Sequence, residues 1–301
     1  MNIILAMLAT FLWGTTYAVT QYSLSGWPPL LLGALRALPA GLLLLAIKPS
    51  IPASKDWPIL LRLGAINIAL FFGLLFIMAQ TLPSAISGVG MVSLPVFAML
   101  YYWLLHKKRP TLIQFISGST LITLAWFLFD PLNLTLNPVG LMAMMAALIS
   151  IIIGSTLIKG LGTKIHWWNV LCWQLIIGGT LLSIISFAHA LKAPEQYLYV
   201  LQHISLLNVL GLIWLIVFNT MLAYALYVWL LSRMTVVEFT FAGISNPIAG
   251  ILMGLVLMGD SFSAFQYLLM SLIILTSLIG SLMSTYFEKK KRKKMNLQNT
   301  Q

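Results

Sequence analysis

Charged side chains are scarce in this chain. They make up 8% of its 301 residues, whereas hydrophobic residues make up 60%, and the mean hydropathy is +0.97. No soluble globular chain of this length has that composition. Because a spanning helix needs about 20 apolar residues, and many windows of that kind are present, the sequence predicts an all-α integral membrane protein.

Residues suited to catalysis or metal binding are also few. Cys172 is the single cysteine, which excludes a disulfide framework and a cysteine-based metal site. None of the six acidic residues is near the middle of a predicted span, and the four histidines fall at helix ends or in loops. A proton relay usually needs a titratable group at depth, so this pattern disfavours proton coupling. It also predicts no metal, no cofactor and no catalytic residue.

Ten spans are predicted from the windows that lack Asp, Glu, Lys and Arg, five in each half of the chain. The breaks between spans coincide with segments such as Trp27-Pro28-Pro29 and Lys107-Lys108-Arg109-Pro110. The first span has no basic segment before it, so we interpret it as a retained helix and not a signal peptide. The predicted spans are 2–22, 29–47, 59–80, 84–105, 111–129, 137–158, 167–188, 207–230, 237–258 and 263–285.

Positive charge is distributed unevenly between the predicted loops. The even-numbered connections and the C-terminal segment hold fifteen Lys and Arg residues, six of them at 289–294, whereas the odd-numbered connections hold only Lys192. Positively charged loops stay on the cytoplasmic side, which predicts a multi-pass protein with both termini cytoplasmic. The net charge of +11 is then a cytoplasmic rim and does not indicate binding to nucleic acid.

Polar residues recur at matched positions in the two halves. Three pairs share an offset of 152 residues, and two pairs nearer the start of each half have offsets of 140 and 138. The matched segments are Asn67 and Asn219, Ser93-Leu94-Pro95 and Ser245-Asn246-Pro247, Gln114 and Gln266, Gly14-Thr15-Thr16 and Gly154-Ser155-Thr156, and Arg36 and Gln174.

This duplication predicts two repeats of five helices. Because five is odd, the second repeat enters the membrane upside down relative to the first. The predicted units are residues 1–135, residues 136–287 and a basic cytoplasmic tail at 288–301. Inverted repeats of this kind are typical of secondary transporters, whose substrate site lies between the repeats.

Arg36 is the sharpest candidate for a substrate-binding residue. It lies seven residues into a predicted helix that begins near Pro29, about 10 Å below the surface. A guanidinium at that depth is costly unless it faces a partner or a cavity. It either binds an anionic group of the substrate, such as a carboxylate, or it snorkels outward or caps carbonyl groups of a neighbouring helix.

The other candidates are uncharged. Asn67 and Asn219 form hydrogen bonds either to substrate or between helices, because lipid cannot satisfy their amides. Ring-bearing or cationic compounds would fit an aromatic cavity, although most aromatic residues in such a protein face lipid or the interface. The predicted substrate-binding set is Trp13, Tyr17, Arg36, Asn67, Ser93, Gln174, Asn219, Tyr224, Ser245 and Asn246.

Proline and small residues mark two helices that could move. Pro95 and Pro247 lie in the middle of the fourth and ninth spans, where each removes a backbone hydrogen bond. Gly88 and Gly243 belong to stripes of small residues that allow close helix packing. We predict packing and gating roles for these four residues. The cavity is expected between spans one to four and six to nine, with spans five and ten outside.

These features together resemble a known family. The Trp-Gly-Thr-Thr-Tyr segment at 13–17, Leu35-Arg36-Ala37-Leu38-Pro39-Ala40-Gly41 and the two proline motifs look like the EamA type of the drug/metabolite transporter superfamily, in its PecM and YedA branch. The resemblance covers about residues 2–285. It implies transport of amino acids, related metabolites, dyes or drugs, mostly as export.

The protein is therefore predicted to be a secondary transporter in a bacterial inner membrane. Its expected partners are a small-molecule substrate and the lipid bilayer, and no binding to nucleic acid is expected. Two alternatives stay open. A membrane-embedded enzyme on a lipid-linked substrate would need buried acids, histidines or a metal. A non-transporting membrane subunit would not need matched polar residues in both halves. The sequence leaves open the substrate, the energy coupling and whether the protein forms a homodimer.

Overall fold

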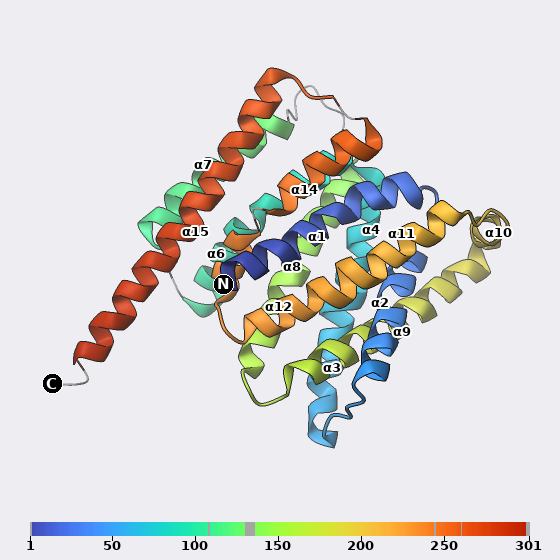
Figure 1. Cartoon of the computed structure of the whole chain (residues 1–301), viewed down its shortest axis with the longest axis horizontal. Helices are drawn as coiled ribbons and strands as arrows, with labels where there is room; N and C mark the ends of the chain where they lie inside the picture. Colours follow the sequence, from blue (N-terminus) through green and yellow to red (C-terminus); the bar gives the residue numbers. More distant parts are fainter. Residues whose placement is uncertain (1, 108, 130–135, 244, 260, 299–301) are drawn as a thin grey trace.

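The computed structural model describes residues 2–107, 109–129, 136–243, 245–259 and 261–298, and the regular structure within these ranges is helical (Figure 1). The helices of the first half are α1 (Asn2–Ser23), α2 (Pro29–Ile47), η1 (Ser54–Asp56), α3 (Trp57–Leu63), η2 (Gly64–Leu70), α4 (Phe71–Thr81), α5 (Ser84–Gly90), η3 (Met91–Ser93), α6 (Leu94–His106) and α7 (Leu112–Phe129). The helices of the second half are α8 (Pro138–Leu161), α9 (Trp167–Lys192), α10 (Pro194–Gln202), α11 (Leu206–Ile216), η4 (Val217–Leu222), α12 (Ala223–Leu231), α13 (Val236–Ala242), α14 (Ser245–Met253), η5 (Gly254–Met258) and α15 (Ala264–Gln298).

The described helices confirm an integral membrane fold. Eight helical stretches are long and apolar enough to cross a membrane, and two shorter apolar helices, Leu112–Leu128 and Ala264–Gly280, occupy the predicted fifth and tenth spans. Most predicted ends lie within a few residues of the observed ones. The last helix is the main difference, because α15 continues to Gln298 through the predicted tail. The predicted boundary between the repeats borders residues 130–135, which lie outside the described part of the chain.

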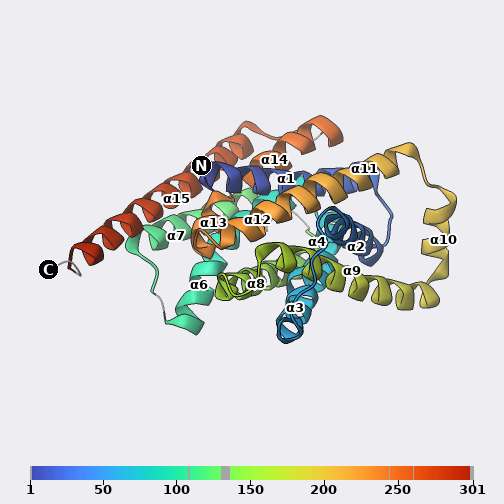
Figure 2. The same ribbon diagram turned by 60° about the horizontal axis from the view of Figure 1, so that its bottom comes forward.

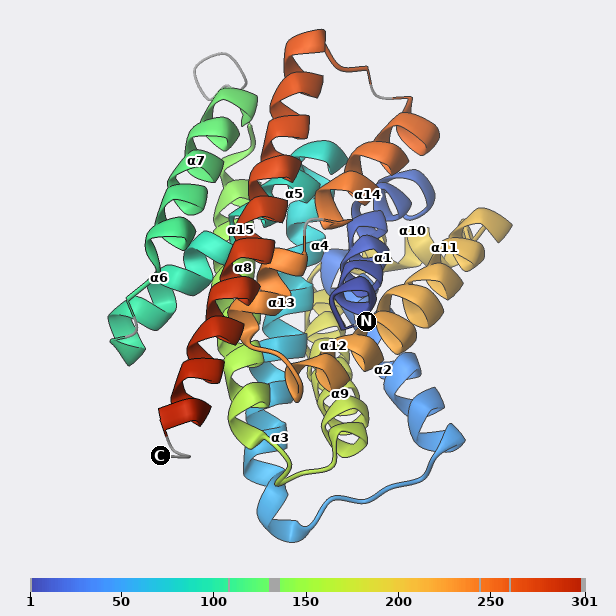
Figure 3. The ribbon, with the colours of Figure 1, turned by 60° about the vertical axis from the view of Figure 1, so that its left-hand side comes forward.

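The bundle has a compact centre and one flanking pair. α2 packs along α9, α1 packs along α14, and α4 packs along α8. α7 and α15 run side by side on one flank, as the prediction placed them (Figure 1 and Figure 3). α10 lies across one end of the bundle between α9 and α11 (Figure 2). We call this end, which also holds Ser23 and Leu82, the α10 end, and the opposite end the α3 end.

Helix boundaries repeat with the same offset as the polar residues. α5 and α13 begin at residues 84 and 236, and α7 and α15 begin at residues 112 and 264, so both pairs differ by 152. The helices that contain Asn67 and Asn219 each have a π-helical segment, η2 and η4, at that position. The division into two repeats stays a prediction, and these matched boundaries support it.

The repeated glutamines are helix caps. The backbone N–H of Thr111 donates to Gln114 Oε1 at 2.9 Å, and that of Ser263 donates to Gln266 Oε1 at 2.9 Å. The Thr111 and Ser263 hydroxyls accept from the glutamine N–H groups at 3.3 and 3.2 Å. Such reciprocal caps satisfy N–H groups that a helix start leaves unpaired. Glu238 caps α13 in the same way, through the backbone N–H of Thr235.

Candidate functional site

Aromatic rings fill the centre of the bundle. Trp13 of α1 packs against Tyr224 and Tyr227 of α12, with ring centroids 5.1 and 5.2 Å apart. Phe72 of α4 meets Tyr224 edge-on at 5.4 Å, and Phe239 of α13 meets Tyr227 at 5.2 Å. These tilted and edge-to-face arrangements are the ones that aromatic quadrupoles favour. Aromatic rings of α1, α4, α12 and α13 therefore lie together in the region where the sequence predicted the cavity.

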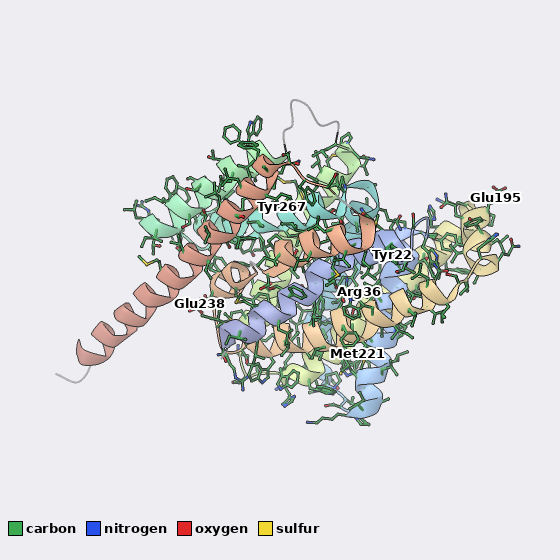
Figure 4. The ribbon with its side chains drawn as sticks, turned by 45° about the horizontal axis from the view of Figure 1, so that its top comes forward. Tyr22, Arg36, Glu195, Met221, Glu238 and Tyr267 are labelled. Carbon is green, nitrogen blue, oxygen red and sulfur yellow. The ribbon has the colours of Figure 1, made fainter. Side chains whose placement is uncertain are left out.

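Arg36 lies beside this cluster, in the middle of the bundle (Figure 4). Its side chain is 1% exposed. Nε donates to the Thr220 hydroxyl at 2.7 Å, and Nη2 donates to the Asn219 carbonyl at 3.1 Å. The guanidinium carbon lies 4.3 Å from the centre of the Phe72 ring, within the range of a cation–π interaction. The predicted carbonyl contact is thus present, although the carbonyl belongs to a π-helical turn inside η4 and not to a helix end.

The π-helical turn explains why that carbonyl can accept these bonds. A π-bulge changes the regular i→i+4 pattern and frees backbone groups inside a helix, often at functional sites. The Asn219 carbonyl accepts from Arg36 and also from Trp13 Nε1, at 3.1 Å. The Leu215 carbonyl accepts from the Thr220 hydroxyl at 2.7 Å. All these groups are satisfied by protein, as the apolar surroundings require.

The Asn219 side chain joins η4 to α1. Its Nδ2 donates to the Leu12 carbonyl at 2.7 Å and to the Thr16 hydroxyl at 2.6 Å, with a longer contact of 3.2 Å to the Thr15 hydroxyl. Trp214 Nε1 also donates to the Thr15 hydroxyl, at 2.9 Å. Asn219 is completely buried. The geometry therefore favours the interhelical alternative for this residue.

Asn67, the predicted equivalent of Asn219, also bonds to other helices. Its Nδ2 donates to Gln174 Oε1 of α9 at 2.8 Å. Tyr227 donates a longer hydrogen bond of 3.5 Å to Asn67 Oδ1, and the Tyr227 and Ser155 hydroxyls are 2.7 Å apart. Gln174, the predicted equivalent of Arg36, thus bonds to an asparagine side chain, whereas Arg36 bonds to an asparagine backbone carbonyl. One buried hydrogen bond shorter than 3.2 Å holds the Asn67 side chain, where the Asn219 side chain has two.

Four buried polar atoms of the predicted set have no hydrogen-bond partner. They are Arg36 Nη1, Gln174 Nε2, the Tyr224 hydroxyl and Asn246 Oδ1. Tyr224 and Tyr17 both lie within electrostatic range of Arg36. Buried polar groups are normally paired, so unpaired ones in a transporter-like centre indicate a place for a ligand or for bound water.

The closest helix contacts differ between the two halves. At the α10 end, α1, α5 and α14 cross closely: a Cβ on Gly14 would overlap with the Asn246 carbonyl, and one on Gly88 would lie 3.4 Å from Gly250 Cα. Gly154 is the predicted equivalent of Gly14. A Cβ there would overlap with Asn67 of η2. α6 and α8 also contact each other much less than α14 and α1 do.

The remaining predicted residues have mainly structural surroundings. The Ser93 hydroxyl donates to the Gly90 carbonyl of its own helix at 2.6 Å. Pro95 is in the first turn of α6, which needs no N–H there. Pro247 and Ser245 are buried in α14, with the Pro247 Cα 3.6 Å from a Cβ on Gly88. A Cβ on Gly243 would meet the carbonyl of Thr240 in its own helix at 2.8 Å, so this glycine is not at a tight contact between helices.

Sequence reasoning missed Thr220 and Thr20. Thr220 orients Arg36, and its position next to the repeated Asn219 was the available signal. Its equivalent at an offset of 152 is Ile68, so the repeat pattern hides it. Thr20 lies one turn beyond Thr16 and has a buried hydroxyl without a partner.

A groove lies away from the aromatic centre. It is a groove of about 260 Å³ between α2, α9 and α10, lined mainly by apolar side chains such as Leu35 and Phe187, with Tyr197 at its edge. The Tyr197 hydroxyl accepts a hydrogen bond from Ser186 at 3.2 Å. None of the predicted substrate-binding residues lines this groove.

Comparison with known proteins agrees with this architecture. Residues 1–129 match the EamA-like transporter family. The chain is 29% identical over 293 residues to Protein PecM of Dickeya dadantii (strain 3937), covering 96% of this chain and 95% of that protein. It is 24% identical over 276 residues to the uncharacterized inner membrane transporter YedA of Escherichia coli (strain K12), covering 90% and 87%. A crystal structure of a protein with 16% identity has the same fold, with a TM-score of 0.67 over 95% of this chain and 98% of that one.

The fold and these relatives define the class: the chain is a multi-pass membrane transporter with a small-molecule substrate. Its first 129 residues match the EamA-like transporter family, which agrees with the resemblance that the sequence predicted. The family match covers the five predicted spans that precede residues 130–135, which is about the length of one predicted repeat.

Proposed function

We propose that this chain is a secondary transporter that moves small metabolites, such as amino acids or related amphiphilic and aromatic compounds, by alternating access. Export from a bacterial cell is the direction that the family resemblance implies. The observation that carries the proposal is the difference in helix packing at positions that the predicted repeat makes equivalent: Gly14 meets α14, whereas Gly154 meets η2. If the two repeats exchanged these packing arrangements, the protein would adopt the other state of alternating access, as inverted repeats allow.

The proposed substrate contacts come from Arg36, Tyr224 and Asn246, each of which has an unpaired buried atom. The aromatic side chains of Trp13 and Tyr17 complete the proposed set. Asn67, Asn219 and Gln174 have the role of hinges between repeats, since their side chains are held by other helices. Ser93 and Ser245 border the moving helices. Gly88 and Pro247 form part of the closed contact, with Pro95 and Gly243 at the corresponding ends of their helices.

The proposed topology places the α3 end and both termini in the cytoplasm. The loops at 48–56, 162–166 and 232–235 lie at that end and hold Lys48, Lys55, Lys164 and Arg233. α10 and Lys192 then lie outside. In this orientation the closed contact between α1, α5 and α14 seals the outer side, so the state seen here is closed to the outside.

Counterflow into proteoliposomes tests this function. The purified protein is loaded with an unlabelled metabolite, and uptake of the labelled compound is followed for a panel of amino acids, aromatic acids and dyes. Protein-dependent counterflow of any member supports the proposal, with liposomes that lack protein as the control. A panel without any counterflow contradicts it and favours a non-transporting subunit. Chemical conversion of a panel compound, detected by mass spectrometry, would favour a membrane enzyme.

A further inference from the structure

Within the described part of the chain, Arg36 forms hydrogen bonds to neutral groups and no ion pair. Among the residues that the structure describes, Arg36 is the only charged side chain that is buried. The labelled acids Glu195 and Glu238 lie near opposite edges of the molecule, far from Arg36 (Figure 4). Removing a charge from water is costly, and neutral hydrogen-bond partners compensate only part of that cost. The site is therefore positively charged and suited to an anion.

The guanidinium is held in a fixed orientation by neutral acceptors. The Thr220 hydroxyl accepts a hydrogen bond from Nε and the Asn219 carbonyl accepts one from Nη2. Nη1 is left without a hydrogen-bond partner. The Tyr224 hydroxyl is also buried and free, and it lies within electrostatic range of Arg36. A carboxylate can accept from both groups, because each of its oxygens has two lone pairs.

The surroundings of these two donors are aromatic. Phe72 lies under the guanidinium, Tyr224 meets Phe72 edge-on, and Trp13 follows on the other side of Tyr224. A flat apolar ring can replace such ring-to-ring contacts without leaving polar groups unpaired. A polar or strongly hydrated molecule cannot. The rest of the ligand is therefore expected to be an aromatic or flat apolar group.

We propose that the substrates of this transporter are small aromatic carboxylates, whose carboxylate is the counter-ion of Arg36 and binds Nη1 and the Tyr224 hydroxyl. This inference rests on the proposed function and adds its substrate class. Thr220 and the Asn219 carbonyl act as positioning groups, because they touch Arg36 and not the carboxylate. The π-helical turn of η4 supplies both of them.

Two matched pairs of probes test the charge requirement. They are 3-phenylpropanoate with 3-phenylpropanamide, and indole-3-acetate with indole-3-acetamide, each pair differing only at the carboxylate. Equilibrium binding to the purified protein is measured at neutral pH, where carboxyl groups with a pKa of about 4 are ionised. We expect each carboxylate to bind at least about tenfold more tightly than its amide, which corresponds to about 1.4 kcal/mol.

Three variants locate the effect. Arg36→Gln should abolish the preference for the carboxylate, and Tyr224→Phe, which keeps the ring contacts, should reduce it less. Lys192→Gln removes a positive charge from an exposed position at the end of α9 and should leave the preference unchanged. If Arg36→Gln does not fold, the wild-type preference and the Tyr224→Phe result still decide the matter.

The inference is overturned if the amides bind as tightly as the carboxylates, if neither carboxylate binds, or if Tyr224→Phe and Lys192→Gln behave alike. Its failure differs from a failure of the proposed function. Counterflow of neutral or cationic compounds that Arg36→Gln does not change would refute the substrate class and leave the transporter intact. Carboxylate binding without counterflow of any compound would refute transport and leave the site.

Discussion

Gly14 should control which side of the transporter is open. It lies where α1 crosses α14, and a methyl group there would overlap with the Asn246 carbonyl and lie 2.8 Å from Ala249 Cβ. Ordinary contact between carbon atoms begins at about 3.5 Å, so α14 has to move away by roughly 0.7 Å or more. Overpacking of this kind costs about 1–3 kcal/mol. The cost applies to the closed contact at the α10 end and not to a state in which that contact is broken.

Gly14→Ala is therefore expected to shift the population toward the state that is open at the α10 end. A difference of about 1–3 kcal/mol corresponds to a shift of roughly 5- to 150-fold. Gly88→Ala is the matched control, since a Cβ there lies 3.4 Å from Gly250 Cα and 3.6 Å from Pro247 Cα, which is ordinary contact. Both changes replace a buried helical glycine in the same crossing.

Cysteine accessibility measures the shift. Thr20→Cys reports on the α10 end, because Thr20 is completely buried one turn beyond Thr16, and Cys172→Ser removes the native thiol. Labelling by a membrane-impermeant maleimide is compared on monodisperse protein. Gly14→Ala should label faster than the parent and Gly88→Ala should not. Equal labelling rates in all three proteins, or equal acceleration by both alanines, would refute the idea that the Gly14 contact is the closed gate.

Three further outcomes are expected. Asn219→Ala should lower the free energy of unfolding more than Asn67→Ala, by roughly 1–3 against 0.6–1.7 kcal/mol in a detergent unfolding titration, because two short hydrogen bonds are lost against one; the reverse order would contradict the assignment. A cysteine at Thr163 should be labelled only from the cytoplasm and one at Gln196 only from outside, and exchange of the two sides would invert the topology. Thr220→Val should weaken aromatic carboxylate binding without affecting the amides, and an equal effect on both would show a loss of packing alone.

The sequence alone determined the membrane fold and located the apolar helices, and it predicted the pairing of equivalent positions. These follow from hydrophobic length, from charge at the loops and from the offset of 152 residues, all of which are local properties of the chain. It also placed Arg36 at depth and put Gln114 and Gln266 near helix starts, where both are found as caps.

The tertiary structure decided which buried polar groups form hydrogen bonds within the protein and which have no partner. Asn67, Asn219 and Arg36 are all polar residues in apolar helices, and sequence offers both substrate and neighbouring helices as their partners. Packing assigns the two asparagine side chains to other helices and leaves Arg36 Nη1 and the Tyr224 hydroxyl unpaired. Equivalent sequences also cannot say which end of the centre is closed. Gly14 meets α14, whereas Gly154 meets η2. The two glycines are equivalent in the predicted repeat, so the sequence does not distinguish their contacts.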